Sequence, residues 1–418
     1  MKINIPKLPI FFQFIIFLSI VEVLVMFILS KIGFGFFQLV PYLRIMSLFF
    51  VFVFILKKKL FNLSFLKISL LKNNENILVV FWFLYAIFGF FIGVLNNNPK
   101  LYLVTDFAYI VIGFVLFRIF QTKYDIQKEQ YNLVLSKRQN KYLLVVFFII
   151  TAISFFLEAE LPSFFIVFII SYSLYLFFLG DKLLSLLYLI PFFLHVLKAN
   201  RSILIVFILA IGLSLLKGRI TKRNIIVGFF TSILILGTIL FFSEEILFFA
   251  IQNLEQGLLK NRINQLYLIA SGKINWNAPN ALSLKQRFVE AELVMEYCFS
   301  NPFRFLFGAG NGGTIEGFSF KDTGVTGASI LGKEAVHNIH LLPFSLFFRY
   351  GFFGLIIFIL LINNSIKYFF QIIFEEPNYK TFLFAFALFW IIYSIPAASF
   401  LWTCSLFWIT LGIISKND

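Results

Sequence analysis

Residues 287–313 read RFVEAELVMEYCFSNPFRFLFGAGNGG, and residues 335–354 read AVHNIHLLPFSLFFRYGFFG. These two segments join the longest polar part of the chain to an apolar helix. They contain two of the three histidines, the densest glycine cluster and an arginine inside an apolar run. If the protein carries out chemistry, we expect that chemistry to lie here.

The composition outside these segments predicts a membrane protein. Of the 418 residues, 60% are hydrophobic and only 13% are charged, and 63 are phenylalanine. Soluble domains have about 25% charged residues, whereas a membrane-spanning helix needs about 20 consecutive apolar residues. The chain is therefore predicted to be all-α and polytopic. About twelve spans are expected, at residues 9–29, 39–56, 77–95, 101–120, 142–157, 162–179, 183–198, 201–216, 224–242, 341–362, 381–396 and 398–414.

The lysines and arginines predict how these spans are oriented. If the N-terminus lies inside, the inner segments carry 21 Lys and Arg residues and the short outer loops carry five. Such an excess marks the cytoplasmic side of a membrane protein. We therefore expect cytoplasmic termini, nine spans in residues 1–242, a large outward-facing loop at 243–340 and three spans in residues 341–418. The net charge of +15 then follows from topology, and no nucleic-acid partner is expected.

The large loop itself has helical patterns. Residues 244–270 are amphipathic and should lie along the membrane face. A second helix should begin at Ser283, which has capping-box spacing to Gln286, and should end before Asn301-Pro302, because the residue before a proline disfavours helix. The turn at 308–313, GAGNGG, suits a nest of N–H groups for anionic oxygens and equally suits a simple tight turn.

Arg349 lies within the apolar run of the tenth expected span. A charge at that depth costs about 2.5–3.5 kcal/mol on insertion scales, so such a side chain usually faces a partner or a cavity. Snorkelling to the outer interface is the plainer alternative. Gly351 and Gly354, on the same helix, allow a neighbouring backbone to approach closely.

His337 and His340 are one helical turn apart, a spacing that suits two metal ligands, but no third ligand with convincing spacing stands nearby. We predict neither a metal site nor a cofactor. A neutral histidine at the membrane boundary suits a general base on a hydroxyl nucleophile, and we assign that role to His337. Helix capping and interfacial hydrogen bonding are the plainer reading, more so for His340.

Several cations are expected at the same membrane level. Lys198 and Arg201 lie in an outer hairpin near His195, and Arg287 lies in the loop helix. The planar guanidinium binds two oxygens at once and suits phosphate. Together with Arg349 they predict an anionic ligand, although a single arginine here would also suit a lipid headgroup.

The loop before the tenth span, with Arg287, NPFRFLFGAGNGG, the pair His337 and Asn338, and the glycines Gly351 and Gly354, resembles the O-antigen polymerase and O-antigen ligase superfamily. Arg201 also matches an arginine common in these proteins. The motifs cover roughly residues 195–355.

The resemblance implies a GT-C-like membrane glycosyltransferase in the bacterial inner membrane. It would act at the outer face on undecaprenyl-diphosphate-linked glycans, with inversion and without a metal ion, and a chain-length regulator is a possible partner. In this family His337 would activate the acceptor hydroxyl and Arg287 would assist catalysis. The donor diphosphate would be held by Arg287 with a further set of residues, namely Arg201, Lys198, Arg349, His340 and Asn338.

Polymerase and ligase differ in the acceptor, which is a second lipid-linked repeat unit or lipid A–core. We favour the polymerase. A transporter or flippase for lipid-linked sugars is the alternative from another class, but it should show internal repeats and cavity-lining charges in both halves of the chain. A purely structural role leaves Arg349 unexplained.

Overall fold

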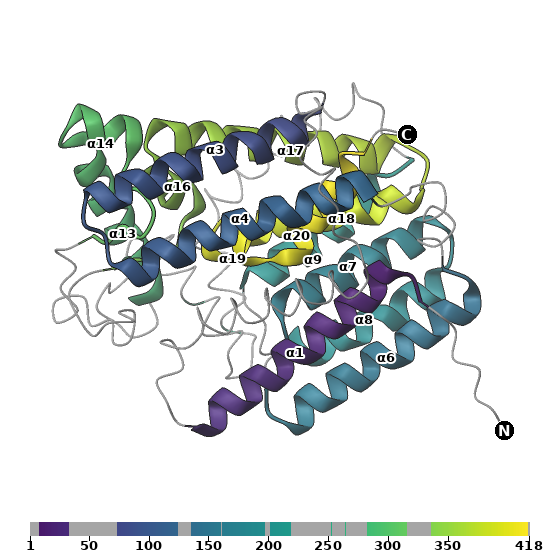
Figure 1. Cartoon of the computed structure of the whole chain (residues 1–418). Helices are drawn as coiled ribbons and strands as arrows, with labels where there is room; N and C mark the ends of the chain where they lie inside the picture. Colours follow the sequence, from purple (N-terminus) through teal and green to yellow (C-terminus); the bar gives the residue numbers. More distant parts are fainter. Residues whose placement is uncertain are drawn as a thin grey trace.

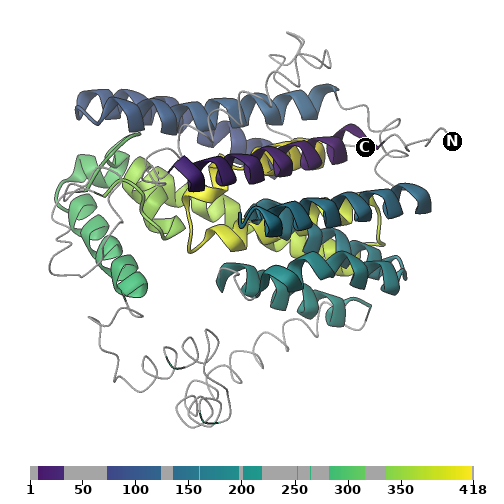
Figure 2. The same ribbon diagram turned by 90° about the horizontal axis from the view of Figure 1, so that it is seen from below.

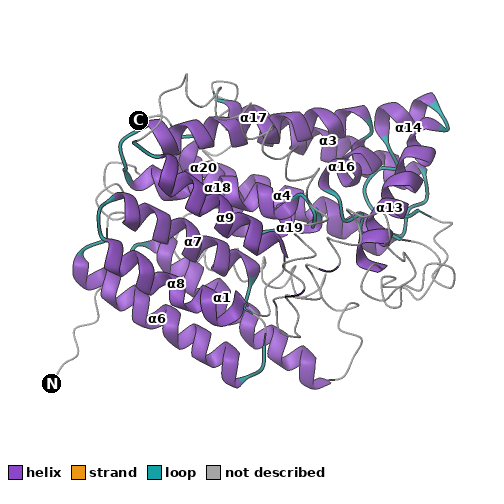
Figure 3. Ribbon diagram, turned by 180° about the vertical axis from the view of Figure 1, so that it is seen from behind, coloured by secondary structure: helices purple, strands orange, loops and turns teal. Residues whose placement is uncertain are grey.

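The computed structural model describes residues 8–32, 73–123, 135–159, 161–196, 201–218, 252, 264, 282–315 and 336–416. Every named element in these residues is a helix, and the β-pairing there is an isolated antiparallel bridge between Ile315 and Val336. Most of the helices lie side by side in one bundle (Figure 1, Figure 3). The predicted all-α class is therefore confirmed for the described part of the chain.

The elements follow one another along the chain as a series of helices separated by short turns or by segments outside the described residues. They are α1 (Ile10–Ile32), α3 (Asn74–Leu95), α4 (Lys100–Lys123), α6 (Lys137–Phe156), α7 (Ser163–Phe178), α8 (Lys182–Val196), α9 (Arg201–Leu216), α13 (Leu282–Phe299), α14 (Pro302–Phe307), α16 (Leu342–Tyr350), α17 (Phe352–Phe374), α18 (Tyr379–Ser394), α19 (Ser399–Thr403) and α20 (Ser405–Ile414).

Within the described part of the chain, four helices are long and apolar enough to cross a membrane: α3, α4 as far as Thr122, α6 and α17. Their outward side chains are apolar, as at Phe88 and Phe91 on α3 and Phe155 on α6, all more than half exposed. Such faces suit lipid rather than water. Several shorter apolar helices accompany them, so the structure is that of a helical membrane protein. The number twelve stays a prediction, and the expected spans 39–56 and 224–242 lie outside the described residues.

Two expected spans are not continuous helices. The tenth, predicted at 341–362, is interrupted at Gly351, where φ is +60°. This left-handed conformation suits glycine, and it separates the short α16 from the long α17. The twelfth, predicted at 398–414, is interrupted at Cys404, which is extended between α19 and α20. Because apolar composition alone cannot place such interruptions, these two predictions were wrong in their continuity.

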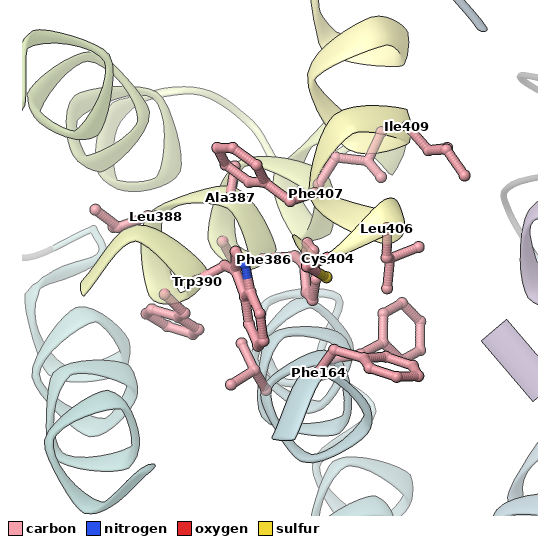
Figure 4. Close-up of a cluster of buried hydrophobic side chains, with 14 of the residues drawn as sticks. Phe164, Phe386, Ala387, Leu388, Trp390, Cys404, Leu406, Phe407 and Ile409 are labelled. Carbon is pink, nitrogen blue, oxygen red and sulfur yellow. The ribbon is translucent and has the colours of Figure 1, made fainter. Parts of the chain in front are cut away.

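The centre of the bundle is formed by α7 and α18. All residues from Phe164 to Leu176 on α7 are buried, and α18 is buried almost throughout. Both helices are therefore surrounded by other helices, an environment that suits apolar side chains on every face. Figure 4 shows Phe164 of α7, Phe386 and Trp390 of α18 and Leu406 of α20 packed together. This core holds the helices whose ends carry the polar residues described below.

Local sequence explains where several helices begin. Ser136 and Gln139 form a capping box at the start of α6, and Asn378 caps α18 with Thr381. The side chain of Asn301 accepts the Phe303 N–H at 2.8 Å, and Pro302 follows at the first position of α14. These are the preferred residues for helix starts.

The loop helix α13 runs from Leu282 to Phe299, close to the predicted start at Ser283 and end before Asn301. Its start differs in detail. Gln286 does not complete the expected capping box, because Ser283 already lies inside the helix; instead Gln286 donates to Glu290 at 2.8 Å. The amphipathic segment 244–270 lies outside the described residues except for Gln252 and Asn264.

Candidate functional site

The helices α13, α14 and α16 gather at one end of the bundle, and the C-terminus lies at the other (Figure 1). Seen from below, α13 sits at the end of the long helices rather than among them (Figure 2). It is held there by a small apolar cluster that includes Val294 and Cys298 of α13 and Phe347 and Phe348 of α16. The two segments quoted first therefore meet in space.

The glycine turn 308–313 is not an open anion nest. All six of its backbone N–H groups have acceptors within the protein: four donate to carbonyl oxygens of other segments and one to a carbonyl within the turn. The sixth, from Gly312, donates to the carboxylate of Asp106 at 2.9 Å. The turn thus meets an anionic oxygen, but this oxygen belongs to α4.

Positive φ values at Gly308, Gly310 and Gly312 make this close fit possible. A Cβ at Gly310 would lie 2.4 Å from the backbone nitrogen of Gly93 on α3. The Asn98 side chain, just after α3, completes the junction by donating to the carbonyls of Ala309 and Asn311 at 2.9 and 2.8 Å. The turn is thereby clamped between α3, α4 and α16.

Asp106 is the centre of a buried ionic cluster, here called the Asp106 cluster, that contains Asp106, Arg349 and His337. The Nε of Arg349 donates to Asp106 Oδ2 at 3.0 Å, and Nε2 of His337 lies 3.5 Å from Oδ1. Arg349 also donates to Ser345 and lies over the Trp402 ring, 4.9 Å from its centroid. The partner expected for a buried Arg349 is therefore present, and it is an acid that the sequence analysis did not name.

A sequence signal for Asp106 existed, because it is the only acidic residue in the apolar run 101–120. Ionisable groups in such runs are costly and usually pair with one another. Both charges are almost fully buried, with 7% of the Asp106 and 4% of the Arg349 side chain exposed. Arg349 is thus engaged by the protein itself. Its contact with a diphosphate stays a prediction.

His337 is held on every side. Its Nδ1 is 2.8 Å from the carbonyl oxygen of Gly313, so Nδ1 carries the proton and donates. The ring stacks on Tyr102 with centroids 4.0 Å apart and planes 3° from parallel. Its other nitrogen faces Asp106. In this arrangement neither nitrogen is directed toward solvent, as a base that accepts a substrate proton would need.

His340 lies in a different setting. Its Nδ1 is 2.9 and 3.0 Å from the two carboxylate oxygens of Glu290 on α13, and its backbone N–H donates to Glu290 at 2.9 Å. The Glu290 side chain is 1% exposed and the His340 side chain 39%. Gln286 donates to the same carboxylate. Apart from its i+4 spacing to Gln286, Glu290 gave no sequence signal, and the sequence analysis missed it.

The two histidines do not form the metal pair considered from their spacing. Residues 337–341 precede α16 and are not helical, so the helical turn that would place both rings together is absent. Each ring instead meets a different carboxylate, on α4 or α13. Within the described residues, no three His, Cys, Asp or Glu side chains lie together as metal ligands.

Arg287 lies on α13, three residues before Glu290, and is partly buried. Its Nε is buried and has no hydrogen-bond partner among the described residues. Burial lowers the pKa of the guanidinium, and the nearby Glu290 carboxylate offsets part of that shift. A buried donor without a partner is costly, which fits a group that waits for an anionic ligand.

The remaining predicted binding residues are not brought into this site by the described structure. Arg201 begins α9, but its side chain, like that of His195, lies outside the described part, and Lys198 falls among residues 197–200, which also lie outside it. Asn338 is described and half-buried. The cationic clamp of Lys198, Arg201 and Arg287 thus stays a prediction.

No family model, no curated protein and no solved structure matches the chain. The resemblance to the O-antigen polymerase and ligase superfamily therefore rests on the sequence motifs alone.

Proposed function

We propose that this protein is a membrane glycosyltransferase that polymerises undecaprenyl-diphosphate-linked oligosaccharide units at the outer face of the bacterial inner membrane. The observation that supports this best is the docking of the loop helix α13 on the segment before α16. It places Arg287, Glu290 and His340 together at one end of an apolar bundle. An imidazole held by a carboxylate can act as a base, and a nearby cation can stabilise a departing diphosphate. Both are needed to transfer a sugar from a lipid diphosphate to a hydroxyl group.

The chemistry asks two things of such a site. A base must take the proton of the acceptor hydroxyl, and cations must stabilise the charge that develops on the departing diphosphate. The histidines of the segment before α16 are candidates for the base, and the following arginines and lysine are candidates for the cations. The Nε of Arg287, three residues before Glu290 on α13, has no hydrogen-bond partner among the described residues, and Arg201 and Lys198 are further candidates by the motif resemblance. That resemblance also implies inversion at the anomeric carbon and a metal-independent reaction.

The Asp106 cluster has a supporting role in this proposal. The Asp106 carboxylate of α4 binds the glycine turn through Gly312 and the last turn of α16 through Arg349, and His337 of the segment before α16 faces the same carboxylate. Rigid placement of the segment 336–341 is what a precise reaction geometry needs, since small displacements of catalytic groups cost large factors in rate. We therefore assign His337 and Arg349 to the framework of the site.

One observation favours the transporter alternative. At the other end of the bundle, Glu75 of α3 is buried and pairs with Lys367 of α17 at 2.8 Å. On the same helix, the buried amide of Asn364 has no hydrogen-bond partner among the described residues. Buried polar groups at both ends of a bundle are the pattern expected of a passage for a polar solute.

The test is a gel of surface glycolipid from a strain in which the gene is deleted, with and without the gene restored. Loss of the polymer ladder to a single repeat on lipid A–core is the result expected for a polymerase. Lipid-linked polymer with bare core would instead identify a ligase. Absence of both repeat and polymer from the outer face, with lipid-linked repeats kept inside, would favour the transporter. An unchanged ladder would refute the polymerase and the ligase for this glycan.

A further inference from the structure

The Glu290–His340 pair has a geometry that a structural contact alone does not require. Both carboxylate oxygens of Glu290 approach the same ring nitrogen, at 2.9 and 3.0 Å. The carboxylate is buried, and Gln286 and the His340 backbone each donate to it. Three donors therefore fix one carboxylate behind one imidazole. A carboxylate placed so orients the ring and stabilises it when it becomes positively charged.

The opposite ring nitrogen of His340 is available. Glu290 contacts only Nδ1, and within the described residues Nε2 has no hydrogen-bond partner. The His340 side chain is 39% exposed, against 7% for His337. Because an ionised carboxylate accepts only, Nδ1 must carry the proton. In the neutral imidazole Nε2 is then the nitrogen with the free electron pair, and it lies on the part of the ring that Glu290 does not contact.

We propose that His340, and not His337, is the general base of this site, and that Glu290 is the residue that positions it. The proposal rests on the glycosyl transfer proposed above. His337 cannot take the role in the same way, because its Nδ1 is held by Gly313 and its Nε2 faces Asp106. In this proposal His337 stabilises the framework of the site and His340 takes part in the reaction.

In the proposed step, the acceptor hydroxyl gives its proton to Nε2 of His340. The acceptor oxygen forms a new bond to the anomeric carbon of the donor sugar. The bond from that carbon to the diphosphate breaks, and the diphosphate leaves on its lipid with the electron pair. The imidazolium is held by the Glu290 carboxylate until its proton passes to water. The products are the elongated glycan, the lipid diphosphate and one proton.

Arg287 lies suitably for the other half of this step. It precedes Glu290 by three residues on α13, and residues at that spacing are neighbours on one helix surface. A cation on the same face as the carboxylate that holds the base can meet the departing diphosphate while the base meets the acceptor. The Glu290–His340 pair would then act on the acceptor hydroxyl, and Arg287 would act on the donor diphosphate in the same transfer step.

The experiment measures glycosidic bond formation by the full-length protein in proteoliposomes. The substrate is the lipid-linked repeat extracted from the deletion strain, and the variants are His340→Ala, Glu290→Gln and Glu292→Gln. Glu292 is exposed on the same helix, so Glu292→Gln is a matched control for loss of one carboxylate. Each rate is measured over a range of donor concentrations, with and without added imidazole. The melting temperature in detergent checks folding.

We expect His340→Ala to lower the rate about 10²–10⁴-fold, the usual contribution of a general base, and added imidazole to restore part of it. Glu290→Gln should lower the rate at saturating donor by about tenfold or more without changing the donor concentration needed for half-maximal rate. Glu292→Gln should match the wild type. A merely structural role for the pair predicts no recovery with imidazole.

Two results would overturn the assignment while leaving the proposed function intact. One is a His340→Ala variant with a rate within about threefold of the wild type, far below what a general base contributes. The other is a loss of rate in His340→Ala that imidazole does not restore at all. Absence of product from the wild-type protein would instead refute the proposed function, and the assignment with it.

Discussion

Replacing Asp106 by asparagine should destabilise the fold strongly, although it changes little in shape. Gly312 N–H and Arg349 Nε both donate to the same oxygen, Oδ2, and the amide oxygen of asparagine can take that place. The hydrogen bonds therefore can persist. What is lost is the negative charge, which leaves the buried Arg349 guanidinium without a counter-ion.

Removing one partner of a buried ion pair costs about 3–5 kcal/mol. Because the acceptor oxygen is retained, we expect Asp106→Asn to lie near 3 kcal/mol, which is roughly a hundredfold in the unfolding equilibrium. Asp106→Ala should cost more, since the buried Gly312 N–H then loses its acceptor as well. We therefore expect the wild type to be the most stable, Asp106→Asn to be less stable and Asp106→Ala to be the least stable.

The assay is the free energy of unfolding in mixed micelles, followed by tryptophan fluorescence as a denaturing detergent is titrated in. Trp402 is a suitable reporter, since Arg349 lies over its ring. Asp181→Asn is the matched control, because Asp181 is exposed in the turn between α7 and α8, and it should change stability by no more than about 0.5 kcal/mol. A loss of less than about 1 kcal/mol in unfolding free energy for Asp106→Asn would refute the idea that the Asp106 charge stabilises the fold by compensating the buried Arg349.

The double variant with Arg349→Met sharpens the test. If the cost of Asp106→Asn is the uncompensated arginine, then removing that arginine too should recover part of the loss. The double variant should therefore be less destabilised than the two single variants added together, by about 1–3 kcal/mol. Strict additivity would mean that the two side chains contribute independently, despite their 3.0 Å contact.

Three further predictions concern other residues. Gly310→Ala should cost about 1–3 kcal/mol in unfolding free energy, because φ is +78° and the new Cβ would meet backbone 2.4 Å away; Gly212→Ala, with open space around it on α9, should be neutral or slightly stabilising in the same titration. Arg287→Gln should reduce polymer length or yield on the glycolipid gel, whereas Arg304→Gln, at an exposed position beside Ser300, should leave the ladder unchanged; a normal ladder from Arg287→Gln would remove Arg287 from the site. Burial raises the pKa of the Cys298 thiol to about 12, so the folded state holds the proton more tightly than the unfolded state does. This contribution to stability is present below the ordinary pKa of a thiol and is lost as the pH rises toward 12; maleimide labelling of Cys298 at pH 8 should therefore follow unfolding, and rapid labelling of the folded protein would contradict the burial.

Much of the fold follows from patterns that act locally. Runs of apolar residues predict helices, and the end of α13 at Phe299 follows from the Asn301-Pro302 stop within two residues. The interruption at Gly351 did not follow, because an apolar helix tolerates glycine and only the contact with Leu306 on α14 requires it there: a Cβ at Gly351 would lie 2.4 Å from the Leu306 backbone. Contacts between segments far apart in the chain decide such breaks.

In the candidate site, too, local sequence predicted some features, whereas contacts between distant segments did not follow from it. Arg349 was recognised as costly from its own neighbours in the sequence, yet its partner Asp106 lies 243 residues earlier. Each of the two residues can be recognised as a charge in an apolar run, but a single sequence does not show which of such charges form an ion pair. Glu290 was harder to find, since an acid in a polar helix has no reason to stand out until the structure shows that it is buried.

The spacing of the two histidines explains why the sequence suggested that they could form a metal pair. On a helix, residues three apart lie on one face, so both rings seemed to share one site. The segment 337–341 is instead non-helical, and Leu341 at its end is extended. His337 accordingly turns to Asp106 on α4, and His340 turns to Glu290 on α13. One short segment thus joins the glycine turn to α4 through the His337 ring, while the His340 side chain stays 39% exposed beside α13.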